Sequence, residues 1–501
     1  MPRIPPGRSV SPWLDQAVLP HRPALDRDLE VDVAVAGAGI VGLTAALLCK
    51  RAGARVAILE GRRIAHGVSG NTTAKVTSLH GLTYASLTAS HGADVAADYG
   101  RANERGVELI AQLVDELGIG CDLRRKPNFT YTEDPAGRGD IEDEVEAAAA
   151  AGLPAAYTDE SDLPFEIAAA VRFDDQAELD PVRYLAALAD EFEGPAHPIY
   201  EHTRAVALAD GTLSTDTGFQ VSAERVVVAT HLPFLDRGMF FARAEPQRSY
   251  ALSVRVTGEI ADGMYLSAES PARSLRAIPW EGGELLLVGG QSHRVGFGDP
   301  AESYRALERD ARERFAFEAV EHRWAAHDFV PEDQLPYVGA ASPFSDRALT
   351  VTGLRKWGLA MGTAAAEMLA DAIAGRDSAW PTAFDARRLP RPGAAVPLIK
   401  HNASSGLHFA GDRLRRQSRT GLEPGEGRVV GSGIGQRAVY RDEDGELHEL
   451  SARCPHLGCI VAWNAAERTW DCPCHGSRFD PSGAVRNGPA TSPLKEHHDE
   501  R

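Results

Sequence analysis

An apolar run, a glycine-rich turn, a helix-like stretch and a second apolar run follow one another near the start of the chain. The apolar runs cover residues 31–36 and 55–60, and the stretch from Leu43 to Ala52 between them has the composition of a helix. Three glycines lie where the first run gives way to the helix: Gly37, Gly39 and Gly42. This order predicts a strand, a tight turn, a helix and a parallel strand, the βαβ unit that binds dinucleotides.

Glu60 ends the second apolar run, eighteen residues after Gly42. Glycines at the turn let the start of the helix approach a pyrophosphate, whose charge the helix N-terminus stabilises. An acid at the end of the second strand is placed to accept a hydrogen bond from a ribose hydroxyl. We therefore predict that Gly37, Gly39, Gly42 and Glu60 bind a dinucleotide.

Residues 422–501 show short β-like runs separated by turns. Residues 427–430 and 436–440 are such runs, and turns are expected at Asp444-Gly445 and Ser482-Gly483. This pattern predicts a small all-β domain. The preceding residues 385–421, rich in Pro, Arg and Gly, are expected to be a connector, with a short helix at residues 397–409.

The 501 residues carry a formal net charge of −18. This charge disfavours nucleic acid and anionic lipid surfaces as partners. The chain shows no apolar run as long as a membrane span and no charged-then-apolar leader at its start. We therefore expect a soluble, cytoplasmic protein that binds neither nucleic acid nor membrane.

Two boxes near the C-terminus hold four of the six cysteines, Cys454-Pro-His456-Leu-Gly-Cys459 and Cys472-Pro-Cys474-His475-Gly-Ser477. A 2Fe-2S centre in which two histidines replace two cysteines on one iron needs one Cys and one His from each of two facing loops. The spacing predicts Cys454 and Cys472 as ligands of one iron, and His456 and His475 as ligands of the other. A zinc site built from the same residue types is the alternative.

Over residues 420–495 the chain resembles the Rieske family, and Gly488-Pro489-Ala490 is similar to that family's proline loop over the cluster. The resemblance implies a disulfide between Cys459 and Cys474, as in the Rieske proteins of respiratory and photosynthetic cytochrome complexes. Free thiols are the alternative, because a lasting disulfide is an exception in a reducing cytoplasm.

The resemblance also bears on the reduction potential of the cluster. Ser477 matches a serine that donates a hydrogen bond to a cluster sulfur in the high-potential members. Those members carry a tyrosine where this chain has Phe479. Because hydrogen bonds to the sulfurs raise the potential, we expect a potential below that of the respiratory clusters.

Three further segments resemble the D-amino acid oxidase-like FAD family, which includes glycine and sarcosine oxidases. They are residues 67–77, residues 225–230 and residues 353–363. The resemblance covers about residues 28–400 and identifies the dinucleotide as FAD. It implies cofactor contacts from these segments at Thr72, Thr73, Ala229, Thr230, Gly353, Trp357, Gly358, Gly362 and Thr363.

The fold implied is an α/β Rossmann-like FAD-binding domain with an interleaved α+β substrate domain built on an antiparallel sheet, followed by the small all-β Rieske domain. Residues 1–27 are expected to form an N-terminal arm, with Trp13 as its anchor. Within residues 28–384 the FAD-binding segments are expected at about 28–80, 170–235 and 335–384, and the substrate-domain segments at about 81–169 and 236–334.

Several features bear on how FAD is held and reduced. An alanine-rich helix is expected from Thr363 to Ala374, and its positive N-terminus would stabilise reduced flavin. Some related dehydrogenases attach FAD covalently through a histidine where this chain has Asn71, so we expect non-covalent FAD. The chain has one dinucleotide fingerprint, so we expect electrons to enter from an organic substrate rather than from a nicotinamide.

Candidates for the substrate site lie in two short segments, residues 247–250 and 273–276. Arg248, Tyr250 and Arg276 are the candidates, and in the two arginines a guanidinium can hold a carboxylate bidentately. Lys75 and Lys356 are expected to face the flavin, where a cation can stabilise its reduced form.

His322 and His327 show the His-x4-His spacing that Rieske oxygenases use with an acid for a mononuclear iron. Ala319 stands where those enzymes carry an acid, which weighs against a second iron site.

These observations predict a dehydrogenase that oxidises a small amine or amino-acid-like substrate by hydride transfer to FAD. Electrons would then leave singly through the Rieske cluster to an unknown acceptor, such as a redox partner protein. An oxygen-using oxidase with a structural or regulatory cluster, and a non-catalytic redox sensor or electron carrier, are the alternatives. The sequence leaves the oligomeric state open.

Overall fold

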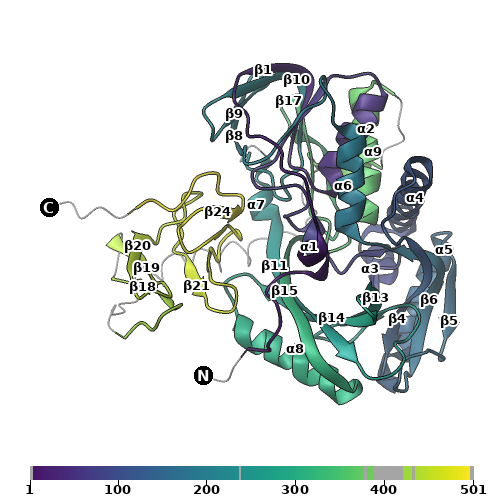
Figure 1. Ribbon diagram of the computed structural model, residues 1–501. Coiled ribbons are helices and arrows are strands. Elements are labelled where there is room, and N and C mark those ends of the chain that lie inside the picture. Colours follow the sequence, from purple (N-terminus) through teal and green to yellow (C-terminus); the bar gives the residue numbers. More distant parts are fainter. Residues whose placement is uncertain (1–3, 236–237, 377–380, 389–420, 432–434, 497–501) are drawn as a thin grey trace.

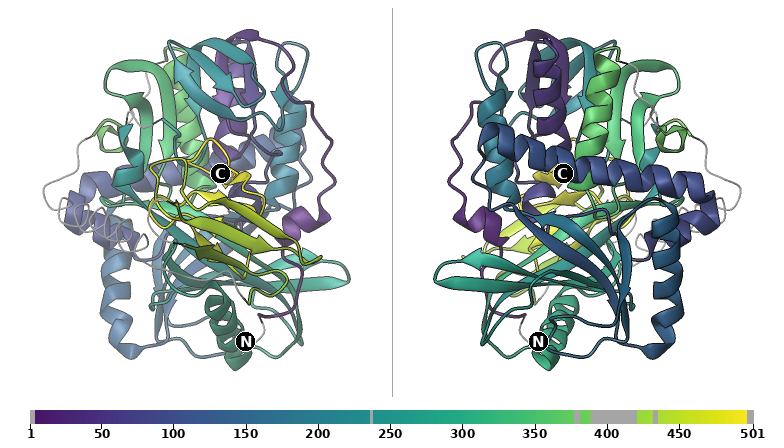
Figure 2. Two further views of the ribbon diagram at one scale, coloured as in Figure 1. Left: turned by 90° about the vertical axis from the view of Figure 1, so that its left-hand side faces the viewer. Right: turned by 90° about the vertical axis from the view of Figure 1, so that its right-hand side faces the viewer.

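The computed structural model describes residues 4–235, 238–376, 381–388, 421–431 and 435–496. Two large sheets with their helices form the main body, and a small β domain packs against one side of it (Figure 1). The small domain covers the junction between the two sheets, as the left view of Figure 2 shows.

The first sheet has eight strands in the order β16-β17-β10-β1-β2-β7, with β8 and β9 attached beside β10. β1 lies between β2 and β10, and both run parallel to it. Both faces of β1 are buried from Val33 onward, which explains its unbroken apolar run. The strands are β1 (Leu29–Ala36), β2 (Val56–Leu59), β7 (Ile199–Tyr200), β8 (Ala205–Ala209), β9 (Thr212–Thr215), β10 (Gln220–Val228), β16 (Tyr337–Ser342) and β17 (Ser345–Thr352).

Helices cover this sheet on the side seen at the right of Figure 1. The helix of the βαβ unit packs against the helix that follows the late glycine-rich segment, and that helix in turn packs on the longest helix. The helices concerned are α2 (Ile40–Arg51), α4 (Ala93–Leu117), α6 (Pro181–Phe192) and α9 (Ala360–Ile373). The predicted helix from Thr363 to Ala374 is thus α9, which begins earlier than predicted, at Ala360.

The second sheet has nine strands in the order β15-β11-β14-β13-β12-β4-β6-β3, with β5 beside β6. It is antiparallel except that β12 and β4 run parallel. The strands are β3 (Lys75–Val76), β4 (Arg124–Thr132), β5 (Ala155–Thr158), β6 (Ala169–Glu178), β11 (Ala244–Val256), β12 (Met264–Ser267), β13 (Arg273–Trp280), β14 (Gly283–Arg294) and β15 (Phe317–Pro331). Residues 75–76 and 170–178, which we had expected in FAD-binding segments, therefore belong to this sheet.

Shorter elements complete the main body. The helices are α1 (Pro12–Gln16), α3 (Thr83–His91), α5 (Arg138–Ala150), α7 (Phe240–Arg243) and α8 (Pro300–Arg314), with 3-10 turns η1 (Ser69–Asn71), η2 (Pro135–Gly137) and η4 (Thr382–Phe384). The N-terminal arm packs through α1, where the Trp13 indole donates to the Thr72 carbonyl oxygen at 2.9 Å. Most of the predicted connector, including the helix expected at residues 397–409, lies outside the described residues.

The small domain consists of two sheets around its own core. The three-stranded sheet comprises β18 (Gly427–Val430), β19 (Arg437–Arg441) and β20 (Leu447–Ser451). The four-stranded sheet comprises β21 (Ala462–Asn464), β22 (Thr469–Asp471), β23 (Arg478–Phe479) and β24 (Val485–Asn487). The predicted runs at residues 427–430 and 436–440 correspond to β18 and β19. Among the described residues of the whole chain, no helix is long and apolar enough to cross a membrane.

Candidate functional site

The glycine-rich turn between β1 and α2 has the shape of a phosphate cradle. Gly37 has a φ of +109°, a backbone conformation that favours glycine. A Cβ at Gly42 would overlap the carbonyl oxygen of Gly37, so the helix can approach the turn only without a side chain there. Gly39 precedes the first turn of α2, where the positive end of the helix dipole suits a pyrophosphate.

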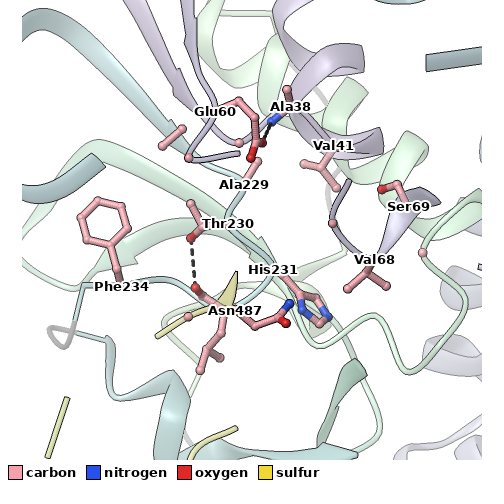
Figure 3. A pocket seen from close by; sticks show the side chains of 18 of the residues that line it. Ala38, Val41, Glu60, Val68, Ser69, Ala229, Thr230, His231, Phe234 and Asn487 are labelled. Atoms are coloured by element: carbon pink, nitrogen blue, oxygen red, sulfur yellow. Dashed lines mark hydrogen bonds between the residues drawn. The ribbon is translucent and has the colours of Figure 1, made fainter. Parts of the chain in front are cut away.

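Glu60 faces this turn from the end of β2 (Figure 3). Its carboxylate accepts backbone hydrogen bonds from Ala38 and Arg62, each at 2.8 Å. Burial raises the pKa of Glu60, although both hydrogen bonds oppose that shift. The acid is therefore fixed beside the position that the turn offers to a nucleotide.

A cavity of about 1480 Å³, its open mouth included, extends from this turn. Of the predicted cofactor residues, seven line it: Gly37, Gly39, Glu60, Thr72, Ala229, Thr230 and Gly358. Gly42 does not line the cavity, but it packs directly against the Gly37 carbonyl group of the turn. The others do not line the cavity: Thr73, Gly353, Trp357, Gly362 and Thr363. Trp357 instead stacks on the His80 ring, with centroids 4.3 Å apart, and Gly362 packs its α9 turn against Val41.

Asp328 organises a strained corner of the same cavity. Its carboxylate contacts the His231 ring nitrogen Nε2 at 3.0 Å and accepts a hydrogen bond from the backbone N–H of Lys356. His231 and Lys356 both have left-handed backbones, with φ of +69° and +73°. Such strain in residues other than glycine persists where surrounding contacts hold it, and it clusters at active sites and ligand-binding sites.

Lys356 is the one predicted catalytic residue that lines this cavity. Its ammonium donates to the Ser292 hydroxyl at 2.6 Å. Desolvation by the cavity wall lowers the pKa of the ammonium, and the nearby Asp328 carboxylate opposes this shift. A cation here would stabilise negative charge that develops in the cavity.

The structure places the other substrate candidates elsewhere. Lys75 is buried against the Tyr265 carbonyl oxygen at 2.5 Å. Arg276 is buried and pairs with Glu178 at 3.2 Å. The Tyr250 hydroxyl contacts His293 at 2.9 Å. None of these three candidates lines the cavity, because each is engaged within the nine-stranded sheet.

His322 and His327 do not form a common metal site. Both lie on β15 five positions apart, so their side chains point to opposite faces of the strand. The His322 ring contacts Ser253 and Asp15, whereas the His327 ring lies beside His231 and Phe329.

The four predicted cluster ligands converge at the tip of the small domain. The Cys454 and Cys472 thiols are buried and in contact, and a hydrogen bond from Cys472 lowers the pKa of Cys454. The rings of His456 and His475 stand perpendicular to each other with centroids 5.0 Å apart. Two thiols beside two imidazoles form the donor set that a Rieske centre requires.

The residues around the ligands bear on stability and potential. Cys459 and Cys474 form a disulfide between the two ligand loops, with Cα atoms 6.5 Å apart. The Ser477 side chain makes a hydrogen bond with Cys454 and also accepts the Ala490 N–H at 3.0 Å. Phe479 is fully buried and offers no hydroxyl to a sulfur.

The small domain forms part of the cavity wall. Residues 486–491, which run from the end of β24 into the predicted proline loop, line the same cavity as the glycine-rich turn. Figure 3 shows Asn487 of this stretch beside Thr230 and His231. The Arg204 guanidinium of the main body donates to the Val485 carbonyl oxygen at 2.9 Å.

The ligand loops themselves touch the main body. The Phe241 ring lies edge-on to both histidines, with centroids 5.2 Å from His456 and 4.9 Å from His475. A Cβ at Gly476 would come within 2.6 Å of the His327 ring, so the second ligand loop packs directly on β15. The candidate cluster and the candidate flavin cavity therefore meet across one close interface.

Comparison with known proteins identifies the family. A model of the FAD dependent oxidoreductase family matches residues 32–372, and a model of the Rieske [2Fe-2S] domain matches residues 418–498. The chain therefore belongs to the FAD-dependent oxidoreductases and carries a C-terminal Rieske domain. Its cofactors are FAD and a 2Fe-2S cluster, and the zinc alternative is excluded. The predicted family and fold class are confirmed.

Similar proteins share all or part of this architecture. The Rieske 2Fe-2S iron-sulfur protein YhfW of Bacillus subtilis (strain 168) is 33% identical over 97% of this chain and 96% of its own. The crystal structure of glycine oxidase from Geobacillus kaustophilus covers 72% of this chain and 100% of its own, at 20% identity and a TM-score of 0.60. That of L-proline dehydrogenase from P. horikoshii covers 73% and 98%, at 18% identity and a TM-score of 0.58.

Some site residues were missed by the sequence analysis. Ser69 lines the cavity and accepts the Ile40 N–H at 3.1 Å, and its place in residues 67–77, which resemble the FAD family, could have suggested it. His231 adjoins Thr230, which was predicted. Asp328 adjoins His327, for which the sequence suggested only a possible role as a metal ligand. No pattern in the sequence predicted that residues 486–491 would line the cavity.

Proposed function

We propose that this protein is a dehydrogenase that oxidises a small amine or amino-acid-like substrate with FAD and passes the electrons singly through its own Rieske cluster to a separate acceptor. FAD supplies two-electron oxidation of a C-N bond, and the cluster accepts one electron at a time. The names of glycine oxidase and L-proline dehydrogenase, whose folds are similar, support an amine-type substrate.

The observation that carries the proposal is the wall shared between the domains. Residues 486–491 of the Rieske domain line the flavin cavity, and Phe241 of the main body contacts both histidines assigned to the cluster. A cluster that served only stability would not need its ligand loops to lie against the flavin domain. The arrangement therefore supports electron transfer within one chain.

Residues of the cavity suggest how a substrate would be oriented. Lys356 provides a positive charge, while Asp328 and His231 provide a paired acid and imidazole on the same wall. In our proposal the pair holds or accepts a proton of the substrate amine, and Lys356 stabilises the electron-rich reduced flavin. Asp328 also fixes the turn that carries Lys356, so its loss would disturb both functions.

FAD is proposed to be held without a covalent bond. The Asn71 side chain donates to the Gly67 carbonyl oxygen at 2.8 Å and lies outside the flavin cavity. None of the described residues that line the cavity is a cysteine or a tyrosine, and His231, the only histidine there, is already held by Asp328. FAD should therefore leave the protein on acid precipitation, and yellow colour in the pellet would contradict this.

The proposed function is tested by an anaerobic screen of amines and amino acids. Flavin absorbance reports the first step, and the EPR signal of the reduced cluster reports the second. We expect one class of amine to bleach the flavin and then to produce the cluster signal. Stoichiometric peroxide in air that is unaffected by a His456→Ala substitution would favour the oxidase alternative instead.

A further inference from the structure

A second cavity lies where the N-terminal arm, the flavin domain and the Rieske domain meet. It measures about 1010 Å³ with its mouth included. Four arginines line it, two from the main body and two from the Rieske domain: Arg62, Arg248, Arg478 and Arg486. Among the described residues that line it, Glu467 is the one carboxylate. Arginines therefore outnumber carboxylates along this lining.

Glu467 compensates part of this charge, and Asp471, which pairs with Arg478 at 2.9 Å, compensates a further part. Its carboxylate pairs with Arg248 and, at 2.6 Å, with Arg478, and it accepts the Tyr304 hydroxyl at 3.1 Å. Arg62 and Arg486 have no side-chain ion pair with any described residue. Burial, and then the nearby charge of Arg486, lowers the pKa of Arg62.

Two buried side chains in the cavity keep hydrogen-bonding groups unused. Arg248 is 2% exposed, yet its Nε and Nη1 groups have no hydrogen-bond partner among the described residues. His327 is 3% exposed, and both of its ring nitrogens likewise lack a partner in the described part of the chain. Buried polar groups in native proteins are rarely left unpaired, and an unpaired donor on a charged group is costly.

We propose that this junction binds a small oxyanion, a carboxylate or a phosphate group, held by Arg62, Arg248 and Arg486. Guanidinium groups match the geometry of both anions and bind them bidentately. An anion at this position would use the free donors of Arg248 and would relieve the repulsion between Arg62 and Arg486. Since its ligands come from both domains, its binding would also hold the Rieske domain in place.

The proposed site is distinct from the phosphate cradle of the FAD cavity. Arg62 and Arg486 border both cavities, whereas Arg248 and His327 line only the one at the junction. The glycines of the turn and Glu60 line only the flavin cavity. The experiment must therefore use protein loaded with FAD and cluster, so that binding to the flavin cavity cannot contribute.

Isothermal titration calorimetry of the loaded protein with inorganic phosphate, and separately with succinate, at constant ionic strength tests the proposal. We expect saturable binding at one site, and the tighter anion identifies the ligand class. Arg486→Gln should weaken anion binding about tenfold. Because Arg486 also borders the flavin cavity, the FAD content of this variant is measured alongside. This variant should fold, because Arg486 is exposed at the cavity rim. Arg468→Gln is the matched control, since Arg468 is an exposed Rieske-domain arginine that pairs with Glu443 and lines neither cavity.

Three results would overturn the proposal. One is the absence of saturable heat with either anion up to tens of millimolar. Another is an Arg486→Gln protein that binds the anion as tightly as the Arg468→Gln control. The third is loss of FAD from the Arg486→Gln protein, which would assign this arginine to the flavin cavity instead.

Discussion

A pair of glycines in one turn allows the contact between the domains to be tested with little else changed. Gly296 and Gly298 lie between β14 and α8, with φ of +80° and +78°. A Cβ at Gly296 would come within 2.6 Å of the Cα of Pro473, which lies between the predicted ligand Cys472 and the disulfide-bonded Cys474. A Cβ at Gly298 would meet only the His293 ring, at 3.5 Å.

Alanine at either glycine incurs the same left-handed backbone cost, about 1–2 kcal/mol. Only Gly296→Ala must also displace Pro473, and overpacking of this kind costs about 1–3 kcal/mol. The additional cost acts on the docking of the second ligand loop, so the docking equilibrium should shift by about 5- to 150-fold. Neither glycine lines the flavin cavity, so FAD should remain bound, and the EPR line shape checks that the cluster is retained.

The assay is transfer of electrons from photoreduced flavin to the cluster under anaerobic conditions, followed by stopped-flow absorbance and freeze-quench EPR. We expect slower transfer in Gly296→Ala and a near-wild-type rate in Gly298→Ala. Flavin absorbance and the EPR line shape serve as controls for cofactor content. Equal rates in the two variants would refute the inference that contact at Pro473 positions the cluster for transfer.

Three further predictions concern single residues. Glu60→Gln should weaken FAD binding about 10- to 100-fold, since a charged acceptor is lost, and fluorescence titration of the apoprotein would measure this. Lys75→Met should leave flavin reduction unchanged and stabilise the fold at neutral pH by about 1–3 kcal/mol, because burial lowers the pKa of Lys75 to about 7 from an ordinary 10.5. Between pH 7 and 10.5 the unfolded wild-type chain binds more protons than the folded one, so wild-type stability rises with pH. The stability difference between Lys75→Met and wild type, measured by urea unfolding, should therefore shrink over this range. A difference that stays constant with pH would contradict this. Phe479→Tyr should raise the cluster potential by donating to a ligand sulfur, and a redox titration showing an unchanged or lower potential would disprove it.

Local chemistry made several parts of the site predictable from sequence. The glycine-rich turn and Glu60 were predictable because strand, turn, helix and acid lie within thirty residues and each has a defined task. The Cys and His boxes were predictable for the same reason, because the ligand spacing is short and specific.

Contacts between distant segments were not predictable in this way. Lys75 and Arg276 carry the charge expected of substrate residues, but the fold uses them inside the nine-stranded sheet, where Arg276 pairs with Glu178. The approach of residues 486–491 to a turn at residues 37–39 depends on how two domains dock. No local sequence pattern predicts how these two domains dock.

Transfer within one molecule is the central claim, and its dependence on protein concentration tests it most directly. Flavin is photoreduced without oxygen at several protein concentrations, and reduction of the cluster is followed by its EPR signal and absorbance. The account predicts that the cluster is reduced after the flavin at a first-order rate independent of concentration. A cluster that stays oxidised beside reduced flavin, or a rate proportional to protein concentration, would contradict it.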